Sequence, residues 1–274
     1  MGINPTIDVK EASIVIQDFI KTYFYSSKCK GIVIGLSGGI DSAVTAILCK
    51  KALGKNKVKC LFLPDETTPN SDINHCKDLV KKFDLYYEKK DITSIIKDVE
   101  KASLLKPNSY TLANIKARIR MVLLFEYANM TNSLVVGTSN KSELLVGYFT
   151  KYGDGGVDIM PIGDLYKTQV YELARFLKVP EDICCKPPTA GLIKGQTDEA
   201  ELKLRYEKLD KILMGLERKT DISEIAKFAD VKESDVVRIK QMRKKSQHKR
   251  RTPLIPKLNL RTVGSDWRSP TFEG

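Results

Sequence analysis

Short apolar runs and longer segments with helical spacing alternate along the first half of the chain. The apolar runs Gly31–Leu36 and Val58–Pro64 are typical of buried strands, and two shorter strands are predicted over Leu85–Lys89 and Leu134–Gly137. The segments with helical spacing are Ala43–Leu53, Ser71–Phe83, Ile92–Ala102 and Leu112–Met130. Because strands that alternate with helices form parallel sheets, the pattern predicts an α/β fold with a doubly wound parallel sheet.

The second half of the chain shows no further strand pattern. Helical spacing is found over Leu165–Leu177, Asp198–Gly215, Asp221–Phe228 and Glu233–Lys245. We expect these helices to form a C-terminal helical cap on a single domain of residues 1–274, with a parallel-sheet core over 31–180 and a helical, basic part over 181–274. The stretch Lys141–Gly163 is rich in glycine, which predicts a long loop that is flexible or ordered by a ligand.

The predicted helix Leu112–Met130 is apolar on nearly all its faces, so we expect it to be covered on several sides. Arg118 and Arg120 interrupt it, and a separation of two residues places them about 200° apart around a helix. They are therefore expected to bind different anions. The alternative is that both are surface arginines whose aliphatic stems lie along apolar neighbours.

The most specific motif is the segment Gly35–Ser42, which joins the first predicted strand to the first predicted helix and reads Gly-Leu-Ser-Gly-Gly-Ile-Asp-Ser. Glycines at such a junction leave backbone N–H groups free, and the N-terminus of the following helix favours an anion. The motif lacks the Lys-Ser or Lys-Thr of a Walker loop and the spacing of a dinucleotide fingerprint. We expect it to bind phosphate; the alternative is an ordinary turn between strand and helix.

Asp41 lies in the first turn of the helix after this motif, where the helix dipole favours a carboxylate. It would repel a phosphate directly, and a bridging Mg²⁺ removes the conflict because Mg²⁺ prefers one or two carboxylates together with phosphate oxygens. The simpler interpretation is that Asp41 only caps the helix. Glu143, five residues after the predicted strand end at Thr138, is a second candidate ligand, or alternatively an exposed helix carboxylate.

The segment Gly35–Ser42 resembles the pyrophosphate loop of the ATP pyrophosphatase family, whose members split ATP between its α- and β-phosphates. Within that group the chain is similar to the NAD synthetases over about its whole length. The further motifs that carry this resemblance are Asn114–Met121, Gly137–Val170, Pro188–Leu192, Gly195–Glu199 and the His-Lys-Arg of residues 248–250. The resemblance implies an adenine nucleotide alpha hydrolase-like fold. We expect the ammonia-dependent form, since the chain has no room for the amidase domain of the glutamine-dependent form.

The same resemblance implies a role for each matching residue. ATP binding is implied for Gly35, Leu36, Ser37, Gly38, Gly39, Ile40, Asp41, Ser42, Arg120, Thr138, Lys167 and Thr189. Deamido-NAD binding is implied for Arg118, Lys151, Asp158, His248 and Lys249. Mg²⁺, the expected cofactor, would be held by Asp41 and Glu143, and catalysis would involve Asp41, Lys167 and Asp158.

The reaction that the resemblance implies is a two-step amidation. The nicotinate carboxylate of deamido-NAD attacks the α-phosphate of ATP with loss of pyrophosphate, and ammonia then attacks the acyl-adenylate to give NAD and AMP. Lys167 is a compact positive charge suited to the α-phosphate, where negative charge grows, although it is equally readable as a solvated lysine at a helix start. The resemblance also implies a homodimer with the deamido-NAD site at the subunit boundary.

The formal net charge is +12, and much of the excess lies in Lys50–Lys59 and Arg238–Arg251. A basic excess serves RNA, a membrane surface or small anionic substrates. We expect small-molecule substrates and neither a nucleic-acid nor a membrane partner, because no apolar run approaches a membrane span and no RNA-binding module is visible. A tRNA-modifying enzyme of the same group and a non-catalytic nucleotide-binding protein are the alternatives. The six cysteines are scattered without a C-x-x-C pair, which indicates a reduced, cytoplasmic protein without zinc or disulfides.

Overall fold

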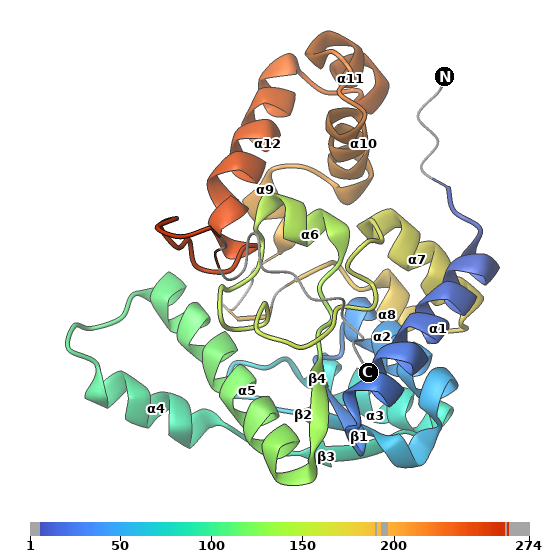
Figure 1. The fold of residues 1–274 in the computed structure, drawn as a ribbon, viewed down its shortest axis with the longest axis vertical. Coiled ribbons are helices and arrows are strands. Elements are labelled where there is room, and N and C mark those ends of the chain that lie inside the picture. Colours follow the sequence, from blue (N-terminus) through green and yellow to red (C-terminus); the bar gives the residue numbers. More distant parts are fainter. Residues whose placement is uncertain (1–5, 190, 193–196, 261, 263–274) are drawn as a thin grey trace.

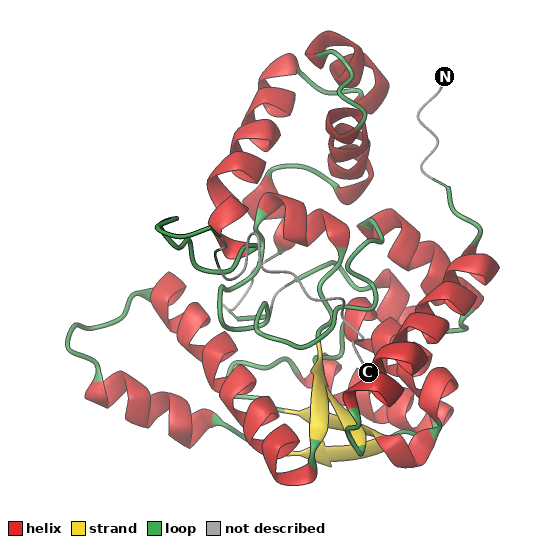
Figure 2. Cartoon of the chain, viewed as in Figure 1, coloured by secondary structure: helices red, strands yellow, loops and turns green. Residues whose placement is uncertain are grey.

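The computed structural model describes residues 6–189, 191–192, 197–260 and 262. Its sheet has the parallel strands β1 (Gly31–Leu36), β2 (Val58–Phe62), β3 (Tyr86–Lys89) and β4 (Ser133–Val136) in the order β3-β2-β1-β4 (Figures 1 and 2). Ile34 of the central strand β1 pairs with Cys60 on one side and Val136 on the other. The predicted α/β fold with a parallel sheet is therefore confirmed.

Helices cover both faces of this sheet because successive side chains of each strand point to opposite faces. Ile32 and Ile34 face an apolar core formed with α1 (Val9–Ser27), α2 (Ile40–Leu53), α3 (Asn70–Phe83), α7 (Lys167–Phe176) and α8 (Glu181–Cys185). Val33 and Val135 face a second core formed with α4 (Thr93–Ala102) and α5 (Ser109–Thr131). The alternation along β1 thus holds the two helical layers together.

Helix α1 is an element that the sequence analysis did not predict. Asp8 caps its N-terminus by accepting hydrogen bonds from the backbone N–H groups of Lys10 and Glu11. Its residues Ile16, Ile20 and Phe24 recur every four positions and are buried, and the helix packs against α2 and α7. The apolar spacing of this helix was therefore present in the sequence and was not used in the sequence analysis.

The C-terminal helices α9 (Asp198–Leu202), α10 (Tyr206–Glu217), α11 (Ile222–Ala229) and α12 (Glu233–Lys245) enclose an apolar cluster of their own, above the sheet in Figure 1. Val146 and Tyr166, which flank the cavity described below, pack into this cluster. The predicted helix Asp198–Gly215 is in fact two helices, because Lys203 takes a left-handed conformation with φ 54° and ends α9.

The predicted loop Lys141–Gly163 is also partly wrong, because its first residues form the helix α6 (Lys141–Val146). Asn140 and Glu143 form a reciprocal capping box that stabilises this short helix. Further on, Ile159 makes an isolated parallel bridge to Val136 at the end of β4. The rest of the stretch is turns and irregular backbone.

Helix α5 is covered on fewer sides than its apolar sequence predicts. Ile119 and Ala128 pack against the sheet, whereas Tyr110, Val122 and Met130 are exposed. Within the part of the chain that the structure describes, no helix is both long and apolar enough to cross a membrane.

Candidate active site

A cavity of about 340 Å³ opens beyond the C-terminal ends of β1, β2 and β4. Among the predicted ATP-binding residues it is lined by Gly35, Leu36, Ser37, Gly39, Ile40, Asp41, Ser42, Arg120, Thr138, Lys167 and Thr189. Its position is where open parallel sheets bind ligands, between β1 and β4 at the point where the strand order reverses. The volume is in the range of small-molecule sites.

The loop between β1 and α2 is held in shape by its two serines. The backbone N–H of Ser37 donates to Ser42 Oγ at 3.2 Å, and the N–H of Gly39 donates to Ser37 Oγ at 3.2 Å. Gly38 has φ 77°, and a Cβ there would lie 2.7 Å from the backbone oxygen of Asp72. Only glycine fits this turn, which explains why Gly38 is required although it does not line the cavity.

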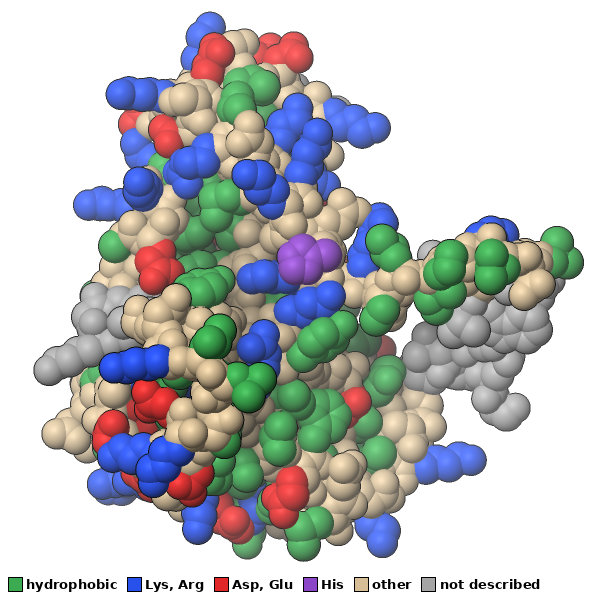
Figure 3. All heavy atoms as spheres, turned by 90° about the vertical axis from the view of Figure 1, so that its left-hand side faces the viewer, with side chains coloured by type: hydrophobic (Ala, Val, Ile, Leu, Met, Phe, Trp, Pro, Cys, Tyr) green, Lys and Arg blue, Asp and Glu red, His purple; other side chains and the backbone are tan. Residues whose placement is uncertain are grey.

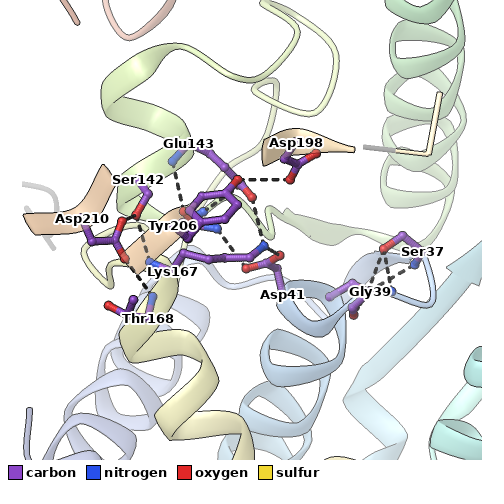
Figure 4. Close-up of polar contacts among 12 residues, drawn as sticks. Ser37, Gly39, Asp41, Ser142, Glu143, Lys167, Thr168, Asp198, Tyr206 and Asp210 are labelled. Atoms are coloured by element: carbon purple, nitrogen blue, oxygen red, sulfur yellow. Dashed lines mark hydrogen bonds and ion pairs between the residues drawn. The ribbon is translucent and has the colours of Figure 1, made fainter. Parts of the chain in front are cut away.

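Three residues from three different helices form an ion cluster at the floor of the cavity (Figure 4). Lys167 Nζ lies 2.5 Å from Asp41 Oδ2 and 3.3 Å from Glu143 Oε1. Asn140 Nδ2 donates to the other oxygen of Asp41 at 3.0 Å. The Lys167 side chain is 3% exposed, so its charge is compensated almost entirely by these two carboxylates.

Burial and the neighbouring charges shift the pKa values of Glu143 and Lys167 in this cluster. Burial raises the pKa of Glu143 to about 8, and the neighbouring Lys167 opposes this rise. Burial alone would lower the pKa of Lys167, but Asp41 and Glu143 outweigh it and raise that pKa, so the ammonium stays protonated. When both acids are ionised, two carboxylates face one cation, which favours a further cation between them.

The donor set fits Mg²⁺ better than a metal with an all-protein coordination shell. Among the described residues, no three His, Cys, Asp or Glu side chains lie close enough together to hold a metal ion by themselves. Asp41 and Glu143 are two hard carboxylates on one cavity, and Mg²⁺ is typically held by one or two carboxylates and completed by phosphate oxygens and water.

Two residues beside this cluster were not assigned a role from the sequence. The ring centroid of Tyr206 lies 5.2 Å from Lys167 Nζ, and the Tyr206 hydroxyl donates to Asp198 Oδ2 at 3.1 Å. Asp198 lines the cavity, and burial raises its pKa. The motif Gly195–Glu199 contains Asp198 and was the available signal, but its residues 195–196 lie outside the described part of the chain.

The two arginines of α5 point in different directions. Arg120 lines the cavity, where Nη2 lies 2.9 Å from Asp65 Oδ2 and Nε donates to the carbonyl of Leu63. Arg118 is exposed, does not line the cavity, and donates to the carbonyl of Lys151 at 3.4 Å.

Asp65, the ion-pair partner of the cavity residue Arg120, was missed by the sequence analysis although it follows β2 closely. Its buried carboxylate lies between Arg120 and Lys116 Nζ, the latter at 3.3 Å. Burial alone would raise the pKa of Asp65, but hydrogen bonds from Thr67 and the charges of Arg120 and Lys116 outweigh it and lower that pKa.

Of the residues predicted to bind deamido-NAD, Lys249 lines the cavity and four do not: Arg118, Lys151, Asp158 and His248. Lys249 Nζ donates to the carbonyls of Gly147 and Phe149, both at 2.7 Å. The segment that carries Lys249 can approach Gly147 closely because Gly147 has no side chain. A Cβ on Gly147, which has φ 75°, would lie 2.1 Å from the Cβ of Ser246. Asp158 is instead tied to the sheet, where its Oδ2 accepts from the N–H of Val135 at 2.7 Å.

Comparison with known proteins identifies relatives over nearly the whole chain. The family model described as NAD synthase matches residues 13–253. The NH(3)-dependent NAD(+) synthetase of Sulfurisphaera tokodaii is 44% identical over 97% of this chain and 95% of its own length. Among solved structures, the NH3-dependent NAD synthetase of Campylobacter jejuni (TM-score 0.78, 34% identity) covers 92% of this chain and 100% of its own. The NMN synthetase of Francisella tularensis (TM-score 0.81, 32% identity) covers 92% and 99%.

We predict that Asp65→Asn destabilises the protein by about 3 kcal/mol at pH 7, because it leaves Lys116 and Arg120 buried without a carboxylate. The pKa of Asp65 is lowered in the folded state. The ionised carboxylate therefore contributes its full share to the free energy of unfolding above about pH 4, the ordinary pKa of aspartate, and this share is lost as the pH falls further. Urea unfolding between pH 7 and pH 2 measures this difference in the free energy of unfolding.

Asp84→Asn is the matched control, because Asp84 pairs with Lys50 and Lys55 at an exposed site. It should change the free energy of unfolding far less than Asp65→Asn does. The stabilising role of the buried ion pairs would be contradicted if Asp65→Asn were as stable as the parent protein at pH 7. It would also be contradicted if the difference in the free energy of unfolding between the two proteins stayed constant down to pH 2.

Proposed function

The chain belongs to the NAD synthase family, and we propose that the cavity beyond β1 and β4 is where it converts deamido-NAD, ATP and ammonia into NAD, AMP and pyrophosphate. The observation that carries this proposal is the ion cluster of Asp41, Glu143 and Lys167 beside the glycine-rich loop. It puts a permanent cation and two candidate metal-binding carboxylates next to the N-terminus of α2, whose N-cap Gly39 makes no side-chain capping hydrogen bond. The family match favours this reaction over the tRNA-modifying and non-catalytic alternatives.

In this proposal the residues Gly35–Ser42 bind the pyrophosphate portion of ATP through backbone N–H groups and the hydroxyls of Ser37 and Ser42. Asp41 and Glu143 hold Mg²⁺, which neutralises the charge of the phosphates when it is bound. Lys167 exchanges its carboxylate partners for the α-phosphate, where negative charge develops during adenylyl transfer. Because its pKa is raised, Lys167 serves as a fixed charge and not as a base.

The described thiols support ammonia as the nitrogen donor. Glutamine hydrolysis needs an activated nucleophile, normally a thiolate. Burial raises the pKa of Cys60 and of Cys76 to about 12, and it raises the pKa of Cys184. The exposed Cys185 also has a raised pKa, because it donates a hydrogen bond to Glu181. All six cysteines are free, which supports a cytoplasmic location for the enzyme.

The positions of the remaining predicted residues support a homodimer. Arg118, Lys151, Asp158 and His248 lie outside the cavity wall, and α5, which carries Arg118, exposes apolar side chains. A two-fold partner on α5 would cover these side chains and place the deamido-NAD residues at the subunit boundary. Lys and Arg side chains gather over the C-terminal helices (Figure 3), which gives anionic substrates a favourable approach.

We predict that the purified protein forms NAD from deamido-NAD, ATP, Mg²⁺ and ammonium chloride, with one AMP and one pyrophosphate per NAD. With ammonia-free glutamine in place of ammonium it should form none, because glutamine hydrolysis needs an activated nucleophile and the thiols with raised pKa values do not supply one. Chromatographic detection of NAD, AMP and glutamate measures the products of both reactions, the one with ammonium and the one with glutamine.

Nicotinate mononucleotide is the substrate control, because one structural neighbour is an NMN synthetase. Amidation of the mononucleotide with a higher kcat/KM than deamido-NAD would contradict the proposed substrate. NAD formation from glutamine with glutamate released in step would contradict the nitrogen donor.

We predict that Asp41→Asn folds normally but lowers kcat by about a hundredfold or more, because the phosphates lose both a metal ligand and its charge compensation. Circular dichroism and steady-state kinetics with excess ATP and Mg²⁺ measure the two effects. Asp164→Asn is the control, since Asp164 also pairs with a lysine, Lys141 at 3.0 Å, but is exposed. Equal activity of the two variants would remove Asp41 from the reaction.

We predict that the protein is a dimer of about twice its 30.8 kDa chain mass in light scattering at micromolar concentration. Val122→Glu on α5 should shift it toward monomer, because it buries a charge in the proposed interface. Ile14→Glu on α1 is the control, since Ile14 is exposed to the same extent (58% against 57%). A monomeric parent protein, or equal effects of both substitutions, would reject this interface.

A further inference from the structure

Asp210 lies behind the ion cluster of the active site, in contact with Ser142 and Thr168, although it belongs to the C-terminal helix α10. Its side chain is buried with 1% exposure, and it lies between the first turns of α6 and α7 (Figure 4). Neither the sequence motifs nor the reaction described above uses it. It is therefore a buried charged group close to the reaction centre whose role is unassigned.

The hydrogen bonds of Asp210 connect it to the backbone of both helices. Its Oδ2 accepts from the backbone N–H of Thr168 at 2.9 Å, and its Oδ1 accepts from the Ser142 hydroxyl at 2.5 Å. Ser142 Oγ in turn accepts from the backbone N–H of Lys167 at 2.9 Å. One carboxylate thus satisfies, directly or through Ser142, two N–H groups that a helix N-terminus otherwise leaves free.

The charge of Asp210 suits this position. A carboxylate at a helix N-terminus interacts favourably with the helix dipole, here that of α7. Burial raises the pKa of Asp210 to about 6, while its hydrogen bonds from Ser142 and Thr168 oppose the rise, so the group is ionised at neutral pH. Keeping a buried charge costs stability that an apolar residue would not cost, which makes a purely structural reason for Asp210 less satisfactory.

The two helices that Asp210 joins carry two of the three members of the ion cluster. Lys167 is the first residue of α7, and its own backbone N–H is part of the network. Glu143 follows Ser142 directly in α6. A displacement at Asp210 would therefore move the ammonium and the carboxylate relative to each other.

We propose that Asp210 is a positioning residue for adenylyl transfer, which holds the starts of α6 and α7 so that Glu143 and Lys167 meet across the phosphate site. The proposal rests on the proposed function of Lys167 at the α-phosphate. It assigns to the C-terminal helices a part in the reaction, beyond covering the cavity. A misplacement of about 1 Å at such a distance from the chemistry is enough to cost a hundredfold in rate.

The test is Asp210→Asn. This substitution keeps the size of the side chain and one acceptor oxygen, but it removes the negative charge and the second oxygen, which accepts from the Ser142 hydroxyl. We expect kcat to fall between about tenfold and a hundredfold while KM for ATP and for deamido-NAD changes less than about twofold. In single turnover without ammonia, pyrophosphate release should slow by the same factor as kcat, because the affected step is adenylate formation.

Ile225→Ala is the matched control, since Ile225 is buried in the same C-terminal cluster but belongs to α11 and is not part of the network. It should lower the thermal midpoint at least as much as Asp210→Asn and leave kcat unchanged. Equal loss of kcat in the two variants would show that Asp210 only stabilises the C-terminal helices, and this would overturn the proposal.

A double variant tests whether Asp210 acts through Lys167. In a Lys167→Ala background, Asp210→Asn should lower kcat by less than about twofold further, because Glu143 then has no ammonium to meet across the phosphate site. Independent, multiplicative losses would overturn the proposal.

Should Asp210→Asn fail to fold, Ser142→Ala decides alone, since it cuts the link to the Lys167 backbone but leaves α10 intact. A fall in kcat with unchanged KM supports the proposal, and an unchanged kcat overturns it. A parent protein that forms no NAD would instead refute the proposed function itself.

Discussion

The ion cluster in which Lys167 bridges Asp41 and Glu143 is the interaction on which the rest of the site depends. It joins α2, α6 and α7, and its members are separated by 126 and 24 residues in the chain. Each acid or base lies within the first three residues of its helix. The cluster therefore forms only if the N-termini of these three helices converge. Three features hold them in place: the phosphate loop, the capping box of Asn140 and the network around Asp210.

The sheet provides the frame in which the N-termini converge. Because β1 lies between β2 and β4, the chain leaves the sheet at neighbouring points after β1 and after β4, and the crevice opens there. The helices on the two faces fix β1 through alternate side chains, so the loop Gly35–Ser42 stands on a rigid support. The C-terminal helices then close the far side of the cavity, where Tyr206 and Asp198 approach Lys167.

The features that local sequence encodes were predictable, and those that need tertiary contacts were not. Strands β1, β2 and β4 carry apolar runs and the turn after β1 carries glycines, and the residues of the ion cluster stand in recognisable motifs. Helix α6 was missed because only six residues form it, and its signal is the three-residue spacing of Asn140 and Glu143. The roles of Asp65, Lys116 and Asp210 depend on distant partners, 42 to 68 residues away in the chain, which no local pattern reveals. The position of Arg118 and Asp158 outside the cavity wall likewise depends on tertiary packing.

The most direct test of this account is a crystal structure of the protein with Mg²⁺ and a non-hydrolysable ATP analogue. We expect a metal ion within about 2.0–2.1 Å of carboxylate oxygens from Asp41 and Glu143, with the phosphates along Gly35–Ser42. Lys167 Nζ should then have left Asp41 for a phosphate oxygen. Phosphates bound elsewhere, with the contact between Lys167 and Asp41 unchanged, would contradict the central claim that this ion cluster is the reaction centre.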